Sequence, residues 1–303
     1  MKQIWLIITA IILLVLRIIF LKFKNETKEN FENPSTSDKI AFCFLTIDNI
    51  HKAELWEDFF KGHEDKYSIY LHPKNPEKVD PAYKKYILGN LVETKWGDIS
   101  LVRATLNLFR EAYKNQNNKI CVLVSDSCIP LNNFDYIYNE LMVNKDQSNI
   151  ISIRNDTPQG YKYRHNSLKL KDPDFIPFIN FKKCSQWCAI NRKTIDFLLK
   201  YDYTDSFSLM FAPDEHYFIN MFDKFKIPYN IMNITHDNWL EPSTDTKYKP
   251  FPKTYTEISD TDIIKARQSG SLFFRKVVKE TKLDTNYLFG NNIGSPNVRI
   301  MTK

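Results

Sequence analysis

The sequence predicts an α/β domain built on a largely parallel central sheet, and three apolar segments support this fold class. Residues 40–47 form a continuous apolar run of strand length, residues 67–72 form a second, and residues 120–124 form a third. A helix-like stretch lies around residues 55–60, between the first two strands. This alternation is the rhythm of β-α-β units, which place their strands in parallel.

The remaining elements follow from spacing and caps. Asp98 is expected to cap a helix whose apolar residues Val102, Leu106, Phe109 and Tyr113 recur at helical intervals. Further expected elements are a strand at 186–191, a helix at 192–200, a helix beginning near 214, a strand at 227–234 and a helix-and-strand unit at 260–278. Residues 156–181 are polar, aromatic and proline-bearing without clean periodicity, and such long connections usually carry function.

The N-terminus predicts a membrane anchor. Residues 4–21 are apolar except for Thr9 and Arg17, and as a helix they span about 27 Å, nearly a bilayer. A cleaved signal peptide is the alternative, but no small-residue cleavage site follows. We expect an anchor at 1–23, a solvated stem at 24–38 and one domain at 39–303.

Composition narrows the function classes. The net charge of +6 comes from scattered lysines, which argues against a nucleic-acid partner. Only 7 glycines are present, and neither glycine-rich phosphate-loop pattern occurs. Five cysteines leave an odd count and mostly sit in apolar runs, so we expect mostly free thiols.

A first candidate site follows the strand at 120–124, where Ser125 and Asp126 stand at its carboxyl end. Ligands of open α/β sheets bind at such ends. The alternative is that Asp126 is only a cap or turn former.

A second candidate is the acidic pair Asp214 and Glu215, followed by His216, at the opening of an amphipathic helix. Adjacent residues on a helix project about 100° apart, so one carboxylate can face a cleft while the other holds the helix start. We take Glu215 and Asp214 as candidate catalytic residues, with an ordinary helix N-terminus as the alternative.

Two further segments suit a sugar nucleotide. Gln186 and Trp187 offer the hydrogen bonding and stacking that a sugar ring requires, although a plain core strand is the alternative. Arg275 and Lys276 end an aromatic run, where cations can meet a diphosphate, or simply be solvated.

No metal site is predicted. The two Asp-x-Asp matches, at 172–174 and 260–262, lie in the polar connection and at a helix start, not after a buried strand. In a sugar-nucleotide enzyme without a metal ion, side-chain cations would neutralise the charge on the leaving diphosphate. This favours the Lys276 region as the diphosphate-binding site.

These segments, in this order, resemble the core-2/I-branching β-1,6-N-acetylglucosaminyltransferase family, and most closely its plant-type branch, over most of residues 39–280. The resemblance rests on short segments at 41–46, 55–63, 67–72, 96–100, 125–131, 185–187, 214–216 and 273–276.

The resemblance implies a GT-A-type (Rossmann-like) fold, a UDP-sugar donor and inversion at the anomeric carbon without a metal ion. It matches Glu215 to the general base, and Lys276 and Lys253 to cations that bind the donor diphosphate. It places Trp239 where relatives contact the acceptor. Cys184 stands where the plant-type pattern has glycine, and the chain lacks the several disulfides of the animal enzymes, so acceptor choice does not carry over.

The expected activity is therefore transfer of N-acetylglucosamine or xylose to a glycan or glycoprotein. The expected location is a single-pass position in a Golgi/ER-type secretory membrane, or a host membrane if a virus encodes the chain. The alternatives are a metal-dependent hydrolase or phosphoesterase using Asp126, Asp214, Glu215 and His216, and an inactive membrane-tethered carbohydrate-binding protein using Trp187 and Trp239.

Overall fold

The computed structural model describes residues 37–143, 145–146, 149–239, 252–284 and 288–289. The chain divides into two units, Met1–Ser37 and Asp38–Lys303, and the second contains every element discussed below. The predicted anchor and nearly all of the predicted stem lie outside the described residues. Among the described residues, no helix combines the length and apolar character needed to span a bilayer.

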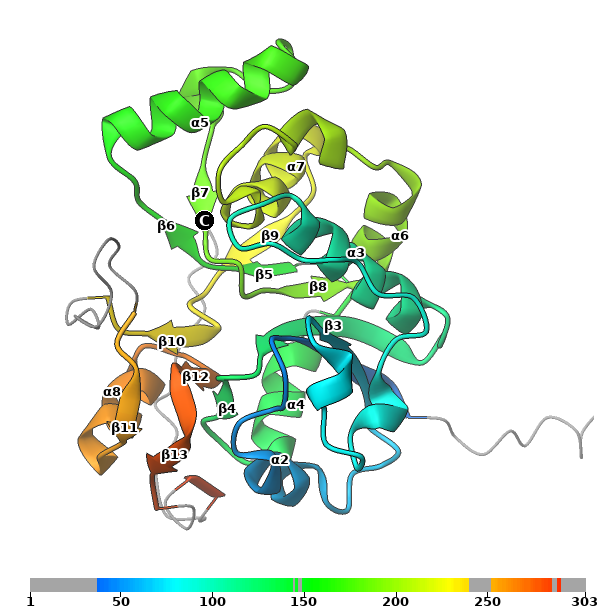
Figure 1. Cartoon of the computed structure of the whole chain (residues 1–303), viewed down its shortest axis with the longest axis vertical. Coiled ribbons are helices and arrows are strands. Elements are labelled where there is room, and N and C mark those ends of the chain that lie inside the picture. The colour runs from blue at the N-terminus through cyan, green and yellow to red at the C-terminus, as the bar shows by residue number, and fades with distance from the viewer. Residues whose placement is uncertain (1–36, 144, 147–148, 240–251, 285–287, 290–303) are drawn as a thin grey trace, which may run out of the picture. The chain divides into compact units, whose positions relative to one another are not determined.

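A six-stranded sheet forms the centre of the domain, in the order β2-β1-β3-β8-β5-β9 (Figure 1). Its strands are β1 (Lys39–Thr46), β2 (Tyr67–Pro73), β3 (Asn118–Ser125), β5 (Asn149–Ile151), β8 (Ala189–Asn191) and β9 (Tyr229–Ile231). The pairings of β1 with β2, β1 with β3 and β5 with β9 are parallel, whereas β8 runs antiparallel to both β3 and β5. The α/β class is confirmed, and the sheet is mixed because of β8.

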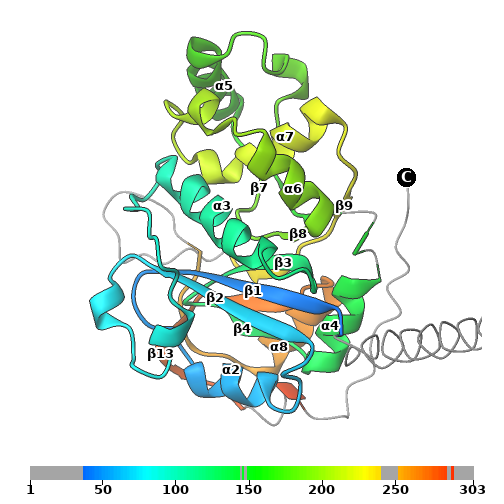
Figure 2. The same cartoon turned by 90° about the vertical axis from the view of Figure 1, so that its right-hand side faces the viewer.

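Helices cover both faces of this sheet, as Figure 2 shows for α3 on one side of β1–β3 and α2 on the other. The α-helices are α2 (Ala53–Phe60), α3 (Ser100–Tyr113), α4 (Phe134–Met142), α5 (Pro158–Lys171), α6 (Arg192–Lys200), α7 (Tyr217–Phe225) and α8 (Asp260–Gln268). Short 3₁₀ turns are η1 (Pro76–Lys78), η2 (Lys84–Tyr86), η3 (Phe178–Asn180), η4 (Thr204–Phe207) and η5 (Pro213–Glu215). The N-cap position of α3 is Ile99 rather than the predicted Asp98, but the Asp98 carboxylate accepts a hydrogen bond from the Ser100 N–H at 2.9 Å, at the first residue of the helix.

Three smaller sheets stand beside the central one. The first has the order β10-β12-β4, the second pairs β11 with β13, and the third pairs β6 with β7. Their strands are β4 (Ile129–Pro130), β6 (Ile153–Arg154), β7 (Lys183–Cys184), β10 (Thr235–Asp237), β11 (Tyr255–Glu257), β12 (Phe273–Arg275) and β13 (Val277–Lys282). The helix-and-strand unit predicted at 260–278 is present as α8, β12 and the start of β13.

An aromatic cluster joins the central sheet to the β10-β12-β4 sheet. Phe42 of β1 is fully buried, and its ring lies 5.0–6.4 Å from those of Trp56, Phe60 and Phe273. Trp56 stacks on Phe273 and donates its indole N–H to the Cys128 carbonyl at 3.0 Å. Strands β1 and β12, whose ends carry the candidate site, are therefore held by this aromatic cluster.

The connection predicted to be irregular at 156–181 contains a 14-residue helix, α5, so this expectation was wrong. Thr157 caps the helix by accepting a hydrogen bond from the Gly160 N–H, and Pro158 occupies the first helical position. The helix buries mainly His165, Ser167 and Leu168, two of which are polar. Apolar periodicity therefore does not indicate this helix, although Thr157 followed by Pro158 is typical of a helix start.

All five cysteines, Cys43, Cys121, Cys128, Cys184 and Cys188, are buried and free, which confirms the prediction. Burial raises the pKa of the Cys43 thiol well above its usual value, as does the neighbouring Cys121 thiol. The five buried thiols therefore pack as small apolar groups.

Replacing Phe42 with alanine is expected to lower the free energy of unfolding by ~3–5 kcal/mol, because it empties the centre of the aromatic cluster. Urea denaturation measures the effect. Tyr163→Ala is the control, since that side chain is 62% exposed and should cost no more than ~0.5 kcal/mol. Equal losses in the two variants would show that the cluster is not the structural centre.

Candidate active site

The first predicted site residues lie where β1 and β3 end side by side. Asp126 directly follows β3, and its Oδ2 accepts a 2.8 Å hydrogen bond from the backbone N–H of Ile47. The Asp126 carbonyl accepts another from the His51 N–H at 2.8 Å. The Ser125 hydroxyl is buried, 3.0 Å from that of Ser127. Asp126 thus lies at the carboxyl edge of the sheet, where ligands bind in open α/β folds.

Two cations reach the same edge from the C-terminal part of the domain. Arg275 ends β12 and Lys276 follows it, and the next N–H, of Val277, donates to the Ser127 carbonyl at 3.0 Å. Partial burial, and then the charge of Arg275, lower the pKa of Lys276, whereas the Asp126 carboxylate opposes that shift. The predicted donor-binding residues Asp126, Arg275 and Lys276 therefore come together.

The Arg275 side chain is held by an aromatic ring. Its guanidinium carbon lies 4.6 Å from the centre of the Trp187 ring, and Trp187 is only 5% exposed. Arg275 Nε is buried and has no hydrogen-bond partner among the described residues. A buried donor left unsatisfied costs about 1–3 kcal/mol, so this N–H is suited to an anionic ligand. Trp187 thus supports a cation here, and its stacking on an acceptor sugar, with the partly buried Gln186, stays a prediction.

Lys253 and Trp239 also approach this group of cations. The Lys253 N–H donates to the Asn238 carbonyl at 2.7 Å, and the Tyr255 N–H donates to the Lys276 carbonyl at 2.9 Å. The ammonium of Lys253 lies 4.9 Å from the centre of the Tyr255 ring. Trp239 is 44% exposed, so its indole is available to a ligand. Its N–H donates to Asp237 at 3.0 Å.

A series of charged residues connects these cations to Glu215, and we call Glu215, Lys183, Arg154, Asp237 and Arg275 the polar track. Glu215 Oε2 lies 3.0 Å from the Lys183 ammonium. Lys183 lies directly opposite Arg154 in the register of the antiparallel β6–β7 pair. Arg154 Nη2 lies 2.5 Å from Asp237 Oδ1. Asp237 in turn lies opposite Arg275 in the register of the parallel β10–β12 pair. Directly paired residues share one face of a sheet, so the track is spatially continuous.

The polar track includes three residues to which the sequence analysis assigned no role. Arg154, Lys183 and Asp237 are each a charged residue at or near the end of a short strand. Arg154 follows the apolar run that contains β5, a signal of the same kind as the one that selected Asp126. Its partner, however, lies 83 residues away in the chain, and only the fold joins them.

Asp214 and Glu215 sit in one 3₁₀ turn but have different surroundings. Asp214 is 8% exposed, and its Oδ1 has no hydrogen-bond partner in the described part of the chain. Burial, and then the adjacent Glu215 charge, raise the pKa of Asp214 to about 7. Glu215 is partly exposed and ion-paired. Of the two predicted catalytic carboxylates, Glu215 is therefore the more accessible.

His216 turns away from both carboxylates. Its Nδ1 lies 2.8 Å from the Lys182 carbonyl, and its ring stacks on Phe181 with centroids 5.0 Å apart. Burial lowers the pKa of His216 to about 3, so the imidazole is neutral in the folded protein. His216 therefore helps to hold η5 against the segment that carries Lys183.

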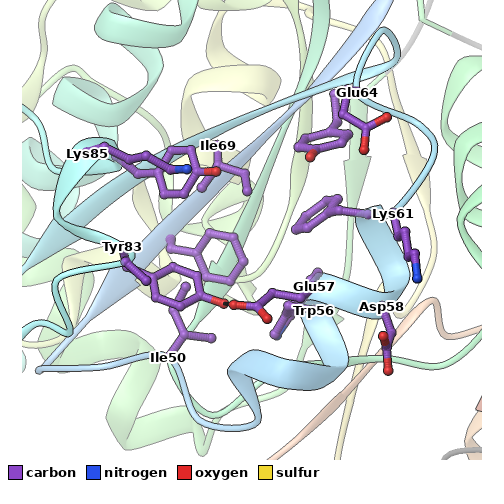
Figure 3. A pocket seen from close by; sticks show the side chains of 14 residues that line it. Ile50, Trp56, Glu57, Asp58, Lys61, Glu64, Ile69, Tyr83 and Lys85 are labelled. Atoms are coloured by element: carbon purple, nitrogen blue, oxygen red, sulfur yellow. Dashed lines mark hydrogen bonds between the residues drawn. The ribbon is translucent and has the colours of Figure 1, made fainter.

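Two further features bear on ligands. Among the described residues, no group of three or more His, Cys, Asp or Glu side chains is arranged to hold a metal ion. A cavity of about 510 Å³ lies between α2, β2 and η2 (Figure 3). Its lining includes Trp56, Glu57 and Tyr83, and it shares no residue with the polar track.

A family model described as "Branch: Core-2/I-Branching enzyme" matches residues 40–267. The chain therefore belongs to the Core-2/I-branching enzyme family, as its sequence segments predicted.

Two individual proteins are similar to the chain. Glycosyltransferase BC10 of Oryza sativa subsp. japonica is 32% identical over 168 residues, which cover 53% of this chain and 40% of the rice protein. The chain thus spans less than half of that relative, whose name agrees with a glycosyltransferase family. The apo crystal structure of mouse xyloside xylosyltransferase 1 aligns with a TM-score of 0.34 and 8% identity, covering 67% of this chain and 89% of that one.

Asp214 should make stability depend on pH. Folding raises the pKa of Asp214 from 3.8 to about 7. The stabilisation that the protonated Asp214 contributes to the free energy of unfolding is therefore complete below pH 4 and is lost as the pH rises towards 7 and above. The free energy of unfolding of the wild type, relative to Asp214→Asn, should therefore fall by a few kcal/mol, at most ~4, between pH 4 and pH 8. Urea denaturation across this range measures the difference, with the exposed Asp205→Asn as control. Parallel curves for wild type and Asp214→Asn would contradict the assignment.

Proposed function

We propose that this chain is an inverting, metal-independent glycosyltransferase of GT-A type, which moves a sugar from a UDP-sugar to a glycan or glycoprotein acceptor. The observation that carries the proposal is the polar track, which joins a partly exposed carboxylate, Glu215, to the cations around Arg275. An inverting transfer needs a base on one side of the sugar and stabilisation of the leaving diphosphate on the other. N-acetylglucosamine and xylose are the proposed donor sugars.

The donor diphosphate is proposed to bind Lys276, Arg275 and Lys253. Their position near Asp126, at the carboxyl edge of β3, suits a nucleotide, and Asp126 and Ser125 complete the proposed donor side. The unsatisfied Nε–H of Arg275 supports an anionic ligand, because a phosphate oxygen would supply the missing acceptor. As the bond to the sugar breaks, these cations offset the negative charge that develops on the diphosphate.

Glu215 is proposed to take the proton from the attacking acceptor hydroxyl. Its ion pair with Lys183 holds the carboxylate in one orientation, so less ordering remains for the reaction step. Asp214 is buried, and its raised pKa favours the neutral acid at mildly acidic pH. The two neighbouring carboxylates therefore need not carry two negative charges at once, which leaves Glu215 as the base and gives Asp214 a supporting position.

The remaining proposals concern the surroundings of the enzyme. Residues 1–23 are proposed to anchor it as a single-pass protein in a Golgi/ER-type secretory membrane, or in a host membrane if it is virus-encoded, and no nucleic-acid partner is proposed.

The hydrolase alternative receives no support from the side-chain positions, because Asp126 bonds to the Ile47 N–H while His216 is buried against Lys182. The exposed indole of Trp239 fits acceptor binding in an active enzyme as well as in an inactive carbohydrate-binding protein.

Glu215→Gln is expected to lower turnover by about 10²- to 10⁴-fold, because the amide keeps the shape of the side chain but cannot accept the proton. UDP binding, measured by isothermal titration calorimetry, should stay close to that of the wild type. Glu140→Gln, on the exposed side of α4, is the matched control and should keep full activity. Full activity of Glu215→Gln would overturn the assignment of the base.

UDP release from a panel of UDP-sugars should identify the donor and should persist in EDTA. Side-chain cations in place of a divalent ion are the reason for this expectation. A magnesium-dependent glycosyltransferase of known activity, assayed in parallel, shows that the chelator works. Loss of activity in EDTA would rule out metal independence, and release of sugar or phosphate without acceptor-dependent UDP formation would favour the hydrolase.

A further inference from the structure

The loop before α3 holds an exposed aromatic residue close to the turn that carries Glu215. Trp96 is 56% exposed, although tryptophan is a large side chain that proteins usually bury to a high degree. Its ring contacts the Phe211 ring, with centroids 5.4 Å apart at an interplanar angle of 69°. Phe211 lies four residues before Glu215 in the chain.

Backbone contacts fix this loop to the catalytic turn. The Ala212 N–H donates to the Gly97 carbonyl at 2.9 Å, and the Glu215 N–H donates to the Ala212 carbonyl at 3.2 Å. Only two hydrogen bonds therefore separate the residue next to Trp96 from the backbone of the proposed base. Ala212 has a φ of 53°, a left-handed conformation that is strained for alanine and that the surrounding contacts must maintain.

Gly97 makes the close approach of the two loops possible. Its φ is +71°, and a Cβ at this position would lie 2.7 Å from Cε2 of Phe211. A side chain there would displace the ring that supports Trp96. The start of α3 restrains the loop further, because the Lys95 N–H donates to the Ser100 hydroxyl at 2.9 Å. Trp96 is thus presented from a well-ordered loop.

From this geometry we propose that Trp96 is an acceptor-binding residue, on whose indole face a pyranose ring of the acceptor stacks beside Glu215. This inference rests on the proposed function and adds the acceptor side of the same site. Sugar rings have apolar C–H faces, and an indole supplies a large apolar surface with little conformational freedom to lose. A platform that is already ordered binds with a smaller entropic cost, which explains why an exposed tryptophan is held by so tight a loop.

The test measures acceptor and donor kinetics of Trp96→Ala and Trp96→Phe in the full-length chain. Methyl β-glycosides of galactose, xylose, N-acetylglucosamine and N-acetylgalactosamine serve as acceptors, because a methyl aglycone has no ring that could itself stack. Trp96→Ala should raise the acceptor KM by roughly 10-fold while the donor KM stays within about 2-fold, and Trp96→Phe should recover part of the loss. Tyr201→Ala is the control, since that exposed ring packs on Phe197 of α6.

The outcomes separate this inference from the proposed function. An unchanged acceptor KM in Trp96→Ala, or equal rises in the donor and acceptor KM, would overturn the role of Trp96 while an active wild type upholds the transferase. A wild type that forms no UDP from any sugar donor and methyl glycoside would instead overturn the proposed function, and the inference with it. Thermal unfolding of Trp96→Ala near that of the wild type confirms that the variant is folded.

Discussion

The ion pair between Arg154 and Asp237 is the contact on which the arrangement of the site depends. The Asp237 side chain is only 4% exposed, and a buried carboxylate without a partner is strongly destabilising. Arg154 belongs to the β6–β7 pair and Asp237 to the β10-β12-β4 sheet. Because an unpaired Asp237 would be destabilising, this ion pair holds the β6–β7 pair, which carries Lys183, against the β10-β12-β4 sheet, which carries Arg275.

The apolar core and the polar site have separate tasks in this domain. The cluster around Phe42 and Trp56 reaches Phe273 in β12, so the strand that presents Arg275 is anchored in the centre of the protein. Polar residues then occupy the strand ends, where backbone groups such as the Ile47 N–H and the Ser127 carbonyl complete the bonding. Rigid packing behind the site keeps charged side chains in place without a covalent crosslink, since all five cysteines are free.

The ionisable groups in and next to the η5 turn differ in their burial. Asp214 and His216 are both buried, and burial shifts each towards its neutral form, raising the pKa of the acid and lowering that of the imidazole. Glu215, between them in the chain, reaches a partly exposed position and the Lys183 ammonium. This short segment thus presents one partly exposed carboxylate to the site, flanked by two buried groups that pack against the backbone.

Local patterns in the sequence determined the elements whose signals are local. The helix at 192–200 is present with those bounds, because Asn191 caps it and its apolar residues are periodic. The strands predicted at 40–47 and 120–124 from uninterrupted apolar runs are present as β1, Lys39–Thr46, and β3, Asn118–Ser125. The tertiary structure decided what depends on distant partners. The chain returns from the α5 excursion in the reverse direction, which makes β7 antiparallel to β6 and β8 antiparallel to β5. No local pattern encodes the contact of Arg275 with Trp187 or the ion pair of Arg154 with Asp237, because the partners lie far apart in the chain. The burial of Asp214 likewise depends on the tertiary structure.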